Sequence, residues 1–455
     1  MAKASMFDGF LVQCAPVFNQ PSFENFSVLL TGWVLAGMRA MTSGALRALG
    51  AKAEKHFSTY YRFFSRAVWE PDALGTCLLQ LLLPFTPPGP LIAIVDDTIA
   101  RKSGRHVWGA NIHHDPLHFM KNAVCFGHNW VVLAIVVQVP LVERGVAVPI
   151  YWRLYRSKKK RSGRTVDGKR ESKATGVATA KDYRKRPELA VELLGVLRGA
   201  VDNERMIRLL GDSAYGGKSV SRHLPQNTAL ISRMVMDAAL YKKAPAPKPG
   251  NNGRPPKKGA RLPSPSQMAQ SKTPWHAITA MLYGKSVTVH YKTTDALWYN
   301  SAGTAMLRIV IVRDPKGKRK DDCFFSTDLS MSPESILEAY ALRWSLEVAF
   351  RDSKQFLGFE RSQCWTRKAV ERTGPFAFVS YAMVILWFIH QGHKLYPQVV
   401  TPVPWYPHKR CPSFADMHQT ARYALLRETL FTDPNKNGGE LKLTEHAESV
   451  LKLAA

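Results

Sequence analysis

Four side chains able to hold a metal ion and phosphates share one face of a helix predicted over residues 332–354. They are Tyr340, Arg343, Glu347 and Lys354, and the last three follow Tyr340 by three, seven and fourteen residues. At about 100° per residue, these offsets place all four within an arc of roughly 60°. An acid, two cations and a phenol on one stripe do not make a core face, so the stripe predicts a site for a metal ion and phosphate groups.

The helix that carries this stripe has recognisable ends. Ser332 is a candidate N-cap and Pro333 suits the first helical position, where a missing N–H costs nothing. Gly358 follows the last periodic residue and is typical of a helix stop.

Acidic residues also end two predicted strands. The apolar run 91–97 ends on Asp96 and Asp97, and the run 205–212 ends on Asp212. Short apolar runs of this kind are typical of strands buried on both faces of a sheet. Because helical patterns separate the strands, we expect an α/β sheet that delivers these acids to one edge.

Three carboxylates far apart in the sequence suit phosphoryl transfer assisted by two metal ions. Asp96 or Asp97, then Asp212 and Glu347, would supply the hard oxygen ligands that Mg²⁺ prefers. Two such ions stabilise both the attacking and the leaving oxygen on phosphorus. The alternative for each strand acid is that it only begins a turn or caps a helix.

The charge balance of the 455-residue chain indicates a polyanionic partner. Lys and Arg number 63 against 35 Asp and Glu, a net charge of +28. A membrane surface could attract the same charge, but apolar runs such as 131–139 are too short to cross a bilayer, and residues 1–18 do not form a secretory signal. We therefore expect DNA or RNA as the partner, in the cytoplasm or nucleoid.

The six cysteines are widely spaced and form no CxxC pair. This pattern predicts reduced thiols and gives no zinc framework.

The order of patterns predicts an α/β catalytic core with a β insertion, flanked by helical regions. Further strands are expected at 129–139 and 228–234 in the core, and at 286–291, 305–312 and 323–327 in the insertion. The expected domains are a helical DNA-binding domain at 1–88, a core at 89–235 and 328–372, a β insertion with a basic Pro/Gly linker at 236–327, and a helical domain at 373–455. An ordinary helical subdomain with an aromatic core is the alternative for 1–88.

Residues 152–186 hold 14 Lys and Arg against three acids. We interpret this run as contacting DNA phosphates, with solvated surface as the alternative. Its centre is Lys158, Lys159, Lys160 and Arg161.

A group of histidines near residue 115 is the other candidate for metal binding. Its members are His113, His114, Asp115, His118 and His128. Pro116 breaks the helix that would align His114 with His118, so a hairpin packed over the acidic strand is the favoured interpretation.

Taken together, these motifs resemble the DDE transposases with the YREK signature, a group of bacterial insertion-sequence enzymes. The signature Y-x2-R-x3-E-x6-K is matched in full at Tyr340, Arg343, Glu347 and Lys354. The sequence AIVDDT resembles the first acidic motif of the family, and the DSAY that begins at Asp212 resembles the second. In the family the first acid is followed, one residue on, by Thr, which favours Asp96 over Asp97.

The resemblance implies an RNase H-like core and two Mg²⁺ ions, with Mn²⁺ able to substitute, held by Asp96, Asp212 and Glu347. It implies strand cleavage at transposon ends, hairpin formation and strand transfer into target DNA. Tyr340, Arg343 and Lys354 would hold phosphates near the cut.

The resemblance also implies an aromatic residue of the insertion that stacks on a flipped base. Trp298 is the first candidate and Trp275 the second, with core packing as the alternative for either. The implied partners are double-stranded terminal repeats, target DNA and a second copy of the chain. Competing interpretations are an RNase H-like nuclease, such as a junction resolvase, and a non-catalytic DNA-binding protein derived from a transposase.

Overall fold

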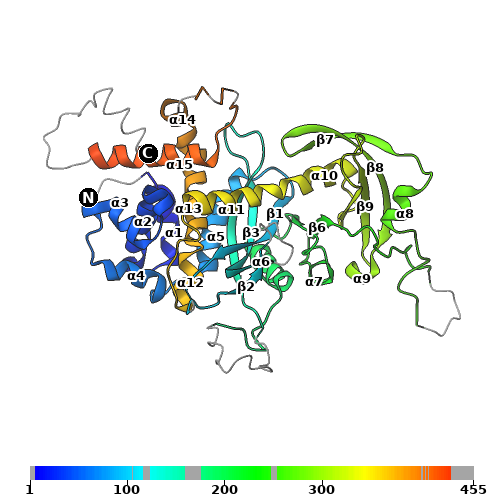
Figure 1. Cartoon of the computed structure of the whole chain (residues 1–455), viewed down its shortest axis with the longest axis horizontal. Helices are drawn as coiled ribbons and strands as arrows, with labels where there is room; N and C mark the ends of the chain where they lie inside the picture. Colours follow the sequence, from blue (N-terminus) through cyan, green and yellow to red (C-terminus); the bar gives the residue numbers. More distant parts are fainter. Residues whose placement is uncertain are drawn as a thin grey trace.

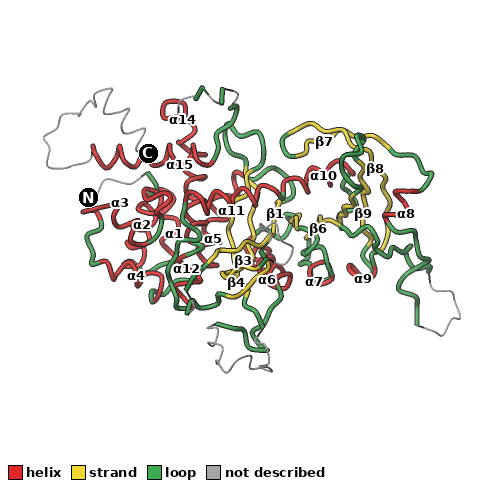
Figure 2. The backbone as a smooth tube through the Cα atoms, viewed as in Figure 1, coloured by secondary structure: helices red, strands yellow, loops and turns green. Residues whose placement is uncertain are grey.

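The structure is a computed structural model, and its elements are labelled in Figure 1. The described residues are 6–104, 106–115, 123–158, 176–246, 254–400, 403–404, 406–407 and 409–431, without the side chains of 429–431. Helices from the two ends of the chain lie together at one end of the molecule, and the β insertion lies at the other (Figures 1 and 2).

One mixed sheet of ten strands joins the two ends of the molecule. Its order is β2-β3-β1-β5-β6-β10-β9-β8-β7, and β4 also pairs with β3. The strands are β1 Leu91–Arg101, β2 Asn111–His114, β3 Val124–Val137, β4 Val146–Tyr155, β5 Ile207–Gly211, β6 Thr228–Arg233, β7 His276–Leu282, β8 Lys285–Leu297, β9 Met306–Arg313 and β10 Asp322–Ser326.

Strands β4, β3, β1, β5 and β6 form the half of the sheet that carries the strand acids. The first three are antiparallel to one another, and β5 and β6 run parallel to β1. This pattern is consistent with an RNase H-like fold. The four core strands predicted from apolar runs are confirmed, although β1 and β3 are longer than predicted.

The insertion continues this sheet. Strand β10 pairs antiparallel with β6, and β9, β8 and β7 follow in turn. The three insertion strands predicted from the sequence are present, and β7 is an additional strand that the apolar pattern did not reveal. The division into four domains stays a prediction.

Fifteen α-helices lie within the described residues, along with short 3₁₀ segments and one π-helical turn at Phe388–Gly392. They are α1 Asp8–Cys14, α2 Gln20–Ala36, α3 Thr42–Leu49, α4 Phe57–Ser65, α5 Pro71–Leu82, α6 Arg186–Ala200, α7 Lys218–Ser221, α8 Pro265–Gln270, α9 Tyr299–Ala302, α10 Pro333–Leu342, α11 Trp344–Phe356, α12 Arg367–Thr373, α13 Phe376–Trp387, α14 His393–Val399 and α15 Phe414–Phe431. Helix α11 packs on β1 and β4, and α6 packs on β3 and β4.

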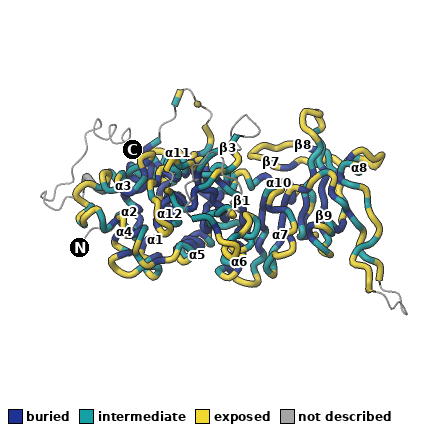
Figure 3. Tube along the Cα trace, turned by 60° about the horizontal axis from the view of Figure 1, so that its bottom comes forward, coloured by how far each residue is buried: buried dark blue, intermediate teal, exposed yellow. Residues whose placement is uncertain are grey.

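Helix α13 lies at the centre of the helical end. All of its residues are buried, and it contacts β4, α2, α5 and α15. One hydrophobic core therefore runs from the terminal helices into the sheet (Figure 3). The helical stretch 367–399 is long and apolar enough to cross a membrane, contrary to the expectation from shorter runs, but its most apolar part is 94% buried inside the protein.

The N-terminal helices contribute an aromatic cluster to this core. Tyr60, Phe63, Phe64 and Trp69 are buried, whereas Tyr61 is exposed. This packing agrees with the aromatic-core interpretation, and the DNA-binding role of the region stays a prediction.

The prediction of six reduced thiols is wrong for one pair. Cys14 of α1 and Cys77 of α5 form a disulfide, with Cα atoms 5.8 Å apart. The partners are 63 residues apart in the sequence, so only the packing of α1 against α5 brings them together.

Candidate active site

Strand β1 sends its two acids to opposite faces of the sheet, because successive strand residues alternate. Asp96 faces α11, where Arg343 reaches it, and Asp97 faces the N-terminus of α6, where Arg186 reaches it. The two faces give these neighbouring carboxylates different surroundings.

Asp97 is occupied by three donors from the protein. The Tyr215 hydroxyl donates to its Oδ1 at 2.9 Å, and Asn129 Nδ2 and Arg186 Nη1 donate to its Oδ2 at 2.9 and 2.8 Å. Both carboxylate oxygens thus accept hydrogen bonds, and these bonds connect β1 to β3, to α6 and to the segment after β5. The choice of Asp96 over Asp97 as the first metal ligand stays a prediction.

Among the described residues, Asp96 pairs with one cation. Arg343 Nη1 lies 2.6 Å from its Oδ2, and the backbone N–H of Asp97 donates to its Oδ1 at 2.8 Å. Burial is the main cause that raises the pKa of Asp96 to about 7; nearby Asp212 adds to this, and Arg343 opposes it. A carboxyl group with so strongly shifted a pKa, in contact with charged neighbours, is typical of a functional site.

Arg343 bridges two of the three candidate metal ligands. The same Nη1 that contacts Asp96 lies 2.9 Å from Glu347 Oε1. The two carboxylate oxygens therefore meet at one nitrogen. Burial opposes the charge of Arg343, but Asp96, Tyr340 and Glu347 outweigh it and raise its pKa. Its Nε is buried without a hydrogen-bond partner among the described residues.

Helices α10 and α11 place Glu347 and Arg343. Ser332 caps α10 by accepting a hydrogen bond from Ser335 N, and Pro333 occupies its first turn, as predicted. Arg343 lies between α10 and α11, and its backbone φ and ψ angles are those of an α-helix. The two helices therefore follow each other with only a local irregularity at this residue. The chain leaves the helix at Gly358, whose φ of 65° suits glycine.

Asp212 reaches the same region from β5. Val95 pairs with Gly211 in parallel register, so Asp96 and Asp212 follow at neighbouring positions. Asp212 adds to the burial that raises the pKa of both Asp96 and Tyr340. Its Oδ1 accepts a hydrogen bond from Ala214 N at 2.9 Å.

The three acids approach one another, but they do not form a ready-made metal site. The described residues contain no group of three acidic, His or Cys side chains close enough to hold an ion. The donor chemistry fits Mg²⁺, and the guanidinium of Arg343 supplies the positive charge between Asp96 and Glu347. We conclude that the residues suit a divalent ion once Arg343 gives up these contacts.

The other two residues of the stripe flank this centre. The Tyr340 ring lies 4.7 Å from that of Phe324 and 5.8 Å from the Arg343 guanidinium carbon. Lys354 Nζ donates to the carbonyl of Ile99 at 2.8 Å and lies 3.3 Å from Glu360 Oε1. Arg343 and Lys354 thus reach residues of β1, whereas Tyr340 packs on Phe324 of β10.

The insertion tryptophans are packed against protein. Trp298 is half-buried, with its ring 5.7 Å from Phe325 and edge-on to it. Trp275 lies against two cations, Arg313 at 4.2 Å and Lys292 at 4.7 Å from the ring centre. A role of Trp298 in DNA binding stays a prediction.

The sequence interpretation missed Tyr283, an insertion aromatic that is 57% exposed. Its position in a Tyr-Gly dipeptide is a turn signal that could have revealed it.

The structure describes only part of the basic run at residues 152–186. Lys158 forms an isolated bridge with Ala178, and its Nζ lies 5.9 Å from the centre of the Tyr183 ring. Lys159, Lys160 and Arg161 lie outside the described residues.

The histidine group does not form a metal site within the described residues. His128 bonds the carbonyl of Trp108, and burial lowers its pKa to about 4. Asp115 pairs with Arg101 at 2.7 Å, and His118 lies outside the described residues. This agrees with the hairpin interpretation, since β2 pairs with β3 at this place.

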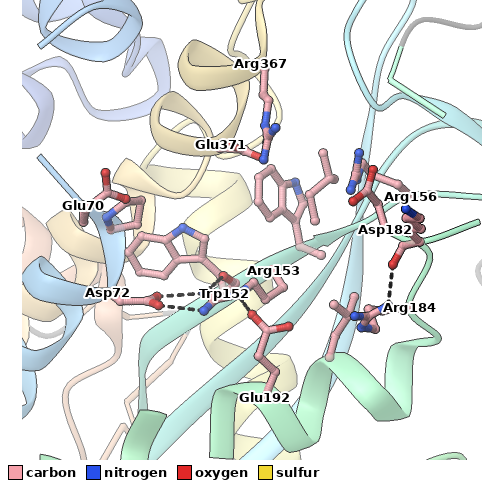
Figure 4. A pocket seen from close by; sticks show the side chains of 15 residues that line it. Glu70, Asp72, Trp152, Arg153, Arg156, Asp182, Arg184, Glu192, Arg367 and Glu371 are labelled. Carbon is pink, nitrogen blue, oxygen red and sulfur yellow. Dashed lines mark hydrogen bonds and ion pairs between the residues drawn. The ribbon is translucent and has the colours of Figure 1, made fainter. Parts of the chain in front are cut away.

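A separate cavity of about 430 Å³ lies beside the edge strand β4 (Figure 4). Arg153 contacts Asp72 at 2.6 Å and Glu192 at 2.7 Å at its wall, which ties β4 to α5 and α6. Because acidic and basic side chains balance in its lining, the cavity has no excess charge for a polyanion.

Comparison with known protein families agrees with this geometry. The model of the DDE superfamily endonuclease family matches residues 15–300, which is more than half of the chain and includes Asp96 and Asp212. The chain belongs to the DDE superfamily endonucleases. Members of this superfamily generally use divalent metal ions and act on DNA.

A second match helps to explain the C-terminal part of this DDE endonuclease. The family model described as archaeal putative transposase ISC1217 matches residues 297–389, which include Arg343 and Glu347. No curated protein matches the chain. The expected DDE membership is thus confirmed, and the narrower YREK group stays a prediction.

Proposed function

We propose that this DDE endonuclease is a DNA transposase that cuts and pastes a mobile element. The observation that carries the proposal is the meeting of Asp96 and Glu347 at Arg343, beside Asp212 at the end of the neighbouring parallel strand. An endonuclease family and a transposase family match the two parts of the chain that contribute these acids.

In this proposal Asp96, Asp212 and Glu347 hold two Mg²⁺ ions, or Mn²⁺ in their place. When bound, the ions would stabilise the attacking and leaving oxygens on the scissile phosphate. Arg343 keeps the acids neutralised and close together until the ions arrive. Its guanidinium, released from the acids, is then able to hold a DNA phosphate bidentately.

Tyr340 and Lys354 extend the phosphate-holding surface along the helix on either side of Arg343. Lys354 is anchored on the Ile99 carbonyl, so its charge is fixed close to strand β1. We propose that these residues position the end of the element while a freed 3′-OH attacks the opposite strand to form a hairpin, and later the target DNA. Two copies of the chain would bring two ends together in the bacterial cytoplasm.

The test is nicking of labelled duplexes taken from the DNA that flanks the coding region. Mg²⁺-dependent nicks at matched inverted repeats, followed by a hairpin product on a denaturing gel, are expected. Nicks without hairpins would favour an RNase H-like nuclease, and binding without nicks would favour a non-catalytic DNA-binding protein. Arg343→Ala and Lys354→Ala are expected to lower the hairpin yield more than the binding of duplex; wild-type hairpin yield would contradict the phosphate role.

A further inference from the structure

A cavity of about 1530 Å³ lies in the outer half of the molecule, between the β7–β8 hairpin, the β9–β10 loop and α10. The hairpin crosses α10 (Figure 1), and Glu338 of the helix accepts a hydrogen bond from Met281 N at 2.8 Å. This bond and the packing of β7 on α10 place the hairpin beside the helix at one side of the cavity. We call it the outer groove.

The rim of the outer groove is strongly cationic. Its exposed cations are Lys285, Lys316, Lys318, Arg319 and Lys320. None of them makes an ion pair within the parts of the chain that the structure describes. Two acids line the same groove, but Asp322 is paired with Arg233 at 2.6 Å and Asp314 accepts a hydrogen bond from Lys316 N. The rim therefore has a net positive charge that the described residues do not neutralise.

The floor of the outer groove is apolar and aromatic. Phe324, Leu337 and Tyr340 form it, and Tyr283 stands at the hairpin tip, with a φ of 54° and 57% of its surface exposed. Arg233 also lines the groove; Asp322 is the main cause that raises its pKa, and Tyr340 and Tyr283 also contribute. Three aromatic side chains thus line the outer groove, with cations at its edge.

We propose that the outer groove binds a single strand of DNA, with its phosphates on the cationic rim and its bases on the aromatic floor. A duplex presents phosphates outward and keeps its base faces stacked, so it would use the rim and not the floor. Single-strand sites combine both features, because every base has a face that can stack. An acidic peptide would use the rim alone.

The outer groove leads toward the candidate active site. Tyr340 lies in its floor, and the guanidinium of Arg343, which holds Asp96 and Glu347, is 5.8 Å from the Tyr340 ring. If the proposed function holds, the groove would receive the unpaired strand next to the cut. The binding itself does not depend on cleavage.

The first test measures the salt dependence of binding. The fluorescence anisotropy of a labelled 12-nucleotide oligothymidylate is titrated with the full-length protein in EDTA, at several salt concentrations. Each phosphate contact contributes about 0.7 to the slope of log affinity against log salt for single strands. The triple variant Lys316→Ala, Lys318→Ala, Lys320→Ala is expected to lower that slope by about 2.

The matched control for this variant removes three exposed cations outside the outer groove. It is Arg47→Ala, Lys272→Ala, Lys394→Ala. An unchanged slope in the groove variant, or an equal change in the control, would overturn the proposal.

The second test measures stacking. Tyr283→Ala is expected to weaken oligothymidylate binding between about 5-fold and 100-fold and to leave duplex binding nearly unchanged. It should also abolish the quenching of 2-aminopurine in a single strand, and Tyr283→Phe should restore both. Neither substitution introduces glycine, so the strained hairpin backbone is the same in all three proteins.

Tyr406→Ala removes an equally exposed tyrosine elsewhere and should change neither reading. Equal losses on single strand and duplex in Tyr283→Ala would overturn the proposal, as would polyglutamate competing as well as oligothymidylate.

The outcome separates this proposal from the proposed function. Duplex nicking without single-strand binding in the outer groove would reject the proposed role of the groove and support the proposed nuclease activity. Single-strand binding that depends on Tyr283 and the rim lysines, without any nicking, would support the proposed role of the groove and reject the proposed nuclease activity.

Discussion

The candidate active site and the outer groove are two charged regions that meet at Tyr340 of α10, and they differ in how their charged side chains are paired. In the active site, Arg343 is paired with both Asp96 and Glu347. On the groove rim, the lysines of the β9–β10 loop make no ion pair within the described residues. Paired, half-buried charges depend little on salt, whereas unpaired exposed cations attract phosphates and are screened by it. The comparison suggests chemistry in the first region and capture of DNA in the second.

The largest effect should come from removing an acid of the active site. Glu347→Gln or Asp212→Asn is expected to lower Mg²⁺-dependent nicking roughly 1000-fold or more, because bound metal ions contribute several kcal/mol to the transition state. DNA binding should change little, since neither residue lines the outer groove. Nicking is measured on a gel and binding by anisotropy. Strand cutting retained in either variant would remove that residue from the metal site.

Removing the central cation should have the next largest effect. Arg343→Ala leaves Asp96 half-buried without its counter-ion and is expected to cost about 2 kcal/mol of unfolding free energy in EDTA. It should also tighten Mn²⁺ binding, measured by calorimetry, because the acids no longer have to release a cation. Arg367→Ala breaks an exposed pair of the same spacing, with Glu371, and should cost only about 0.5 kcal/mol. Weaker Mn²⁺ binding by Arg343→Ala would contradict the bridging role.

The two neighbouring acids of β1 should differ in their response to pH. Burial raises the folded pKa of Asp96 to about 7, above the roughly 3.9 of an unfolded chain. The stability from its bound proton is therefore full below pH about 4 and is lost as the pH rises to about 7. Asp96→Asn should gain stability over the wild type at pH 8 and little at pH 5, in urea unfolding without metal.

Asp97→Asn is the control for that experiment. It weakens contacts with Tyr215, Asn129 and Arg186, so it should lose stability at both pH values. A gain in Asp97→Asn at pH 8, or none in Asp96→Asn, would mean that the faces of β1 are assigned wrongly.

The smallest effect is expected at Arg233, a paired cation that lines the outer groove. Arg233 and Asp322 form an ion pair in which the Arg233 side chain is 52% exposed. Arg233→Ala should change the unfolding free energy by less than about 1 kcal/mol, because exposed pairs contribute little. A loss as large as that of Arg343→Ala would show that burial does not distinguish the two regions.

Local rules predicted the elements that carry the site. Ser332 and Pro333 correctly marked the start of the helical stretch, but the one predicted helix is two, because α10 ends at Leu342 and α11 begins at Trp344. The apolar runs correctly placed β1 and β5, although β1 runs past Asp96 to Arg101 and does not end at the acid. These features depend on neighbouring residues, so the sequence alone could reveal them.

Features that depend on tertiary contacts were not predictable in this way. The occupation of Asp97 requires Tyr215, Asn129 and Arg186 from three other segments, and the Cys14–Cys77 disulfide joins two helices far apart in the sequence. Strand β7 escaped detection because exposed residues dominate it, which leaves little apolar alternation.

The continuity of the sheet from β6 into β10 has a consequence for any shortened form of the protein. Excision of 236–327 would strip the outer edge of β6 and leave its N–H and C=O groups unpaired, a template for aggregation between molecules. In the intact chain the exposed border is moved outward to β7, where Glu338 blocks one of its free N–H groups. The insertion thus also protects β6 from pairing with other molecules. A protein that lacks the insertion would need another segment paired with β6 to stay soluble.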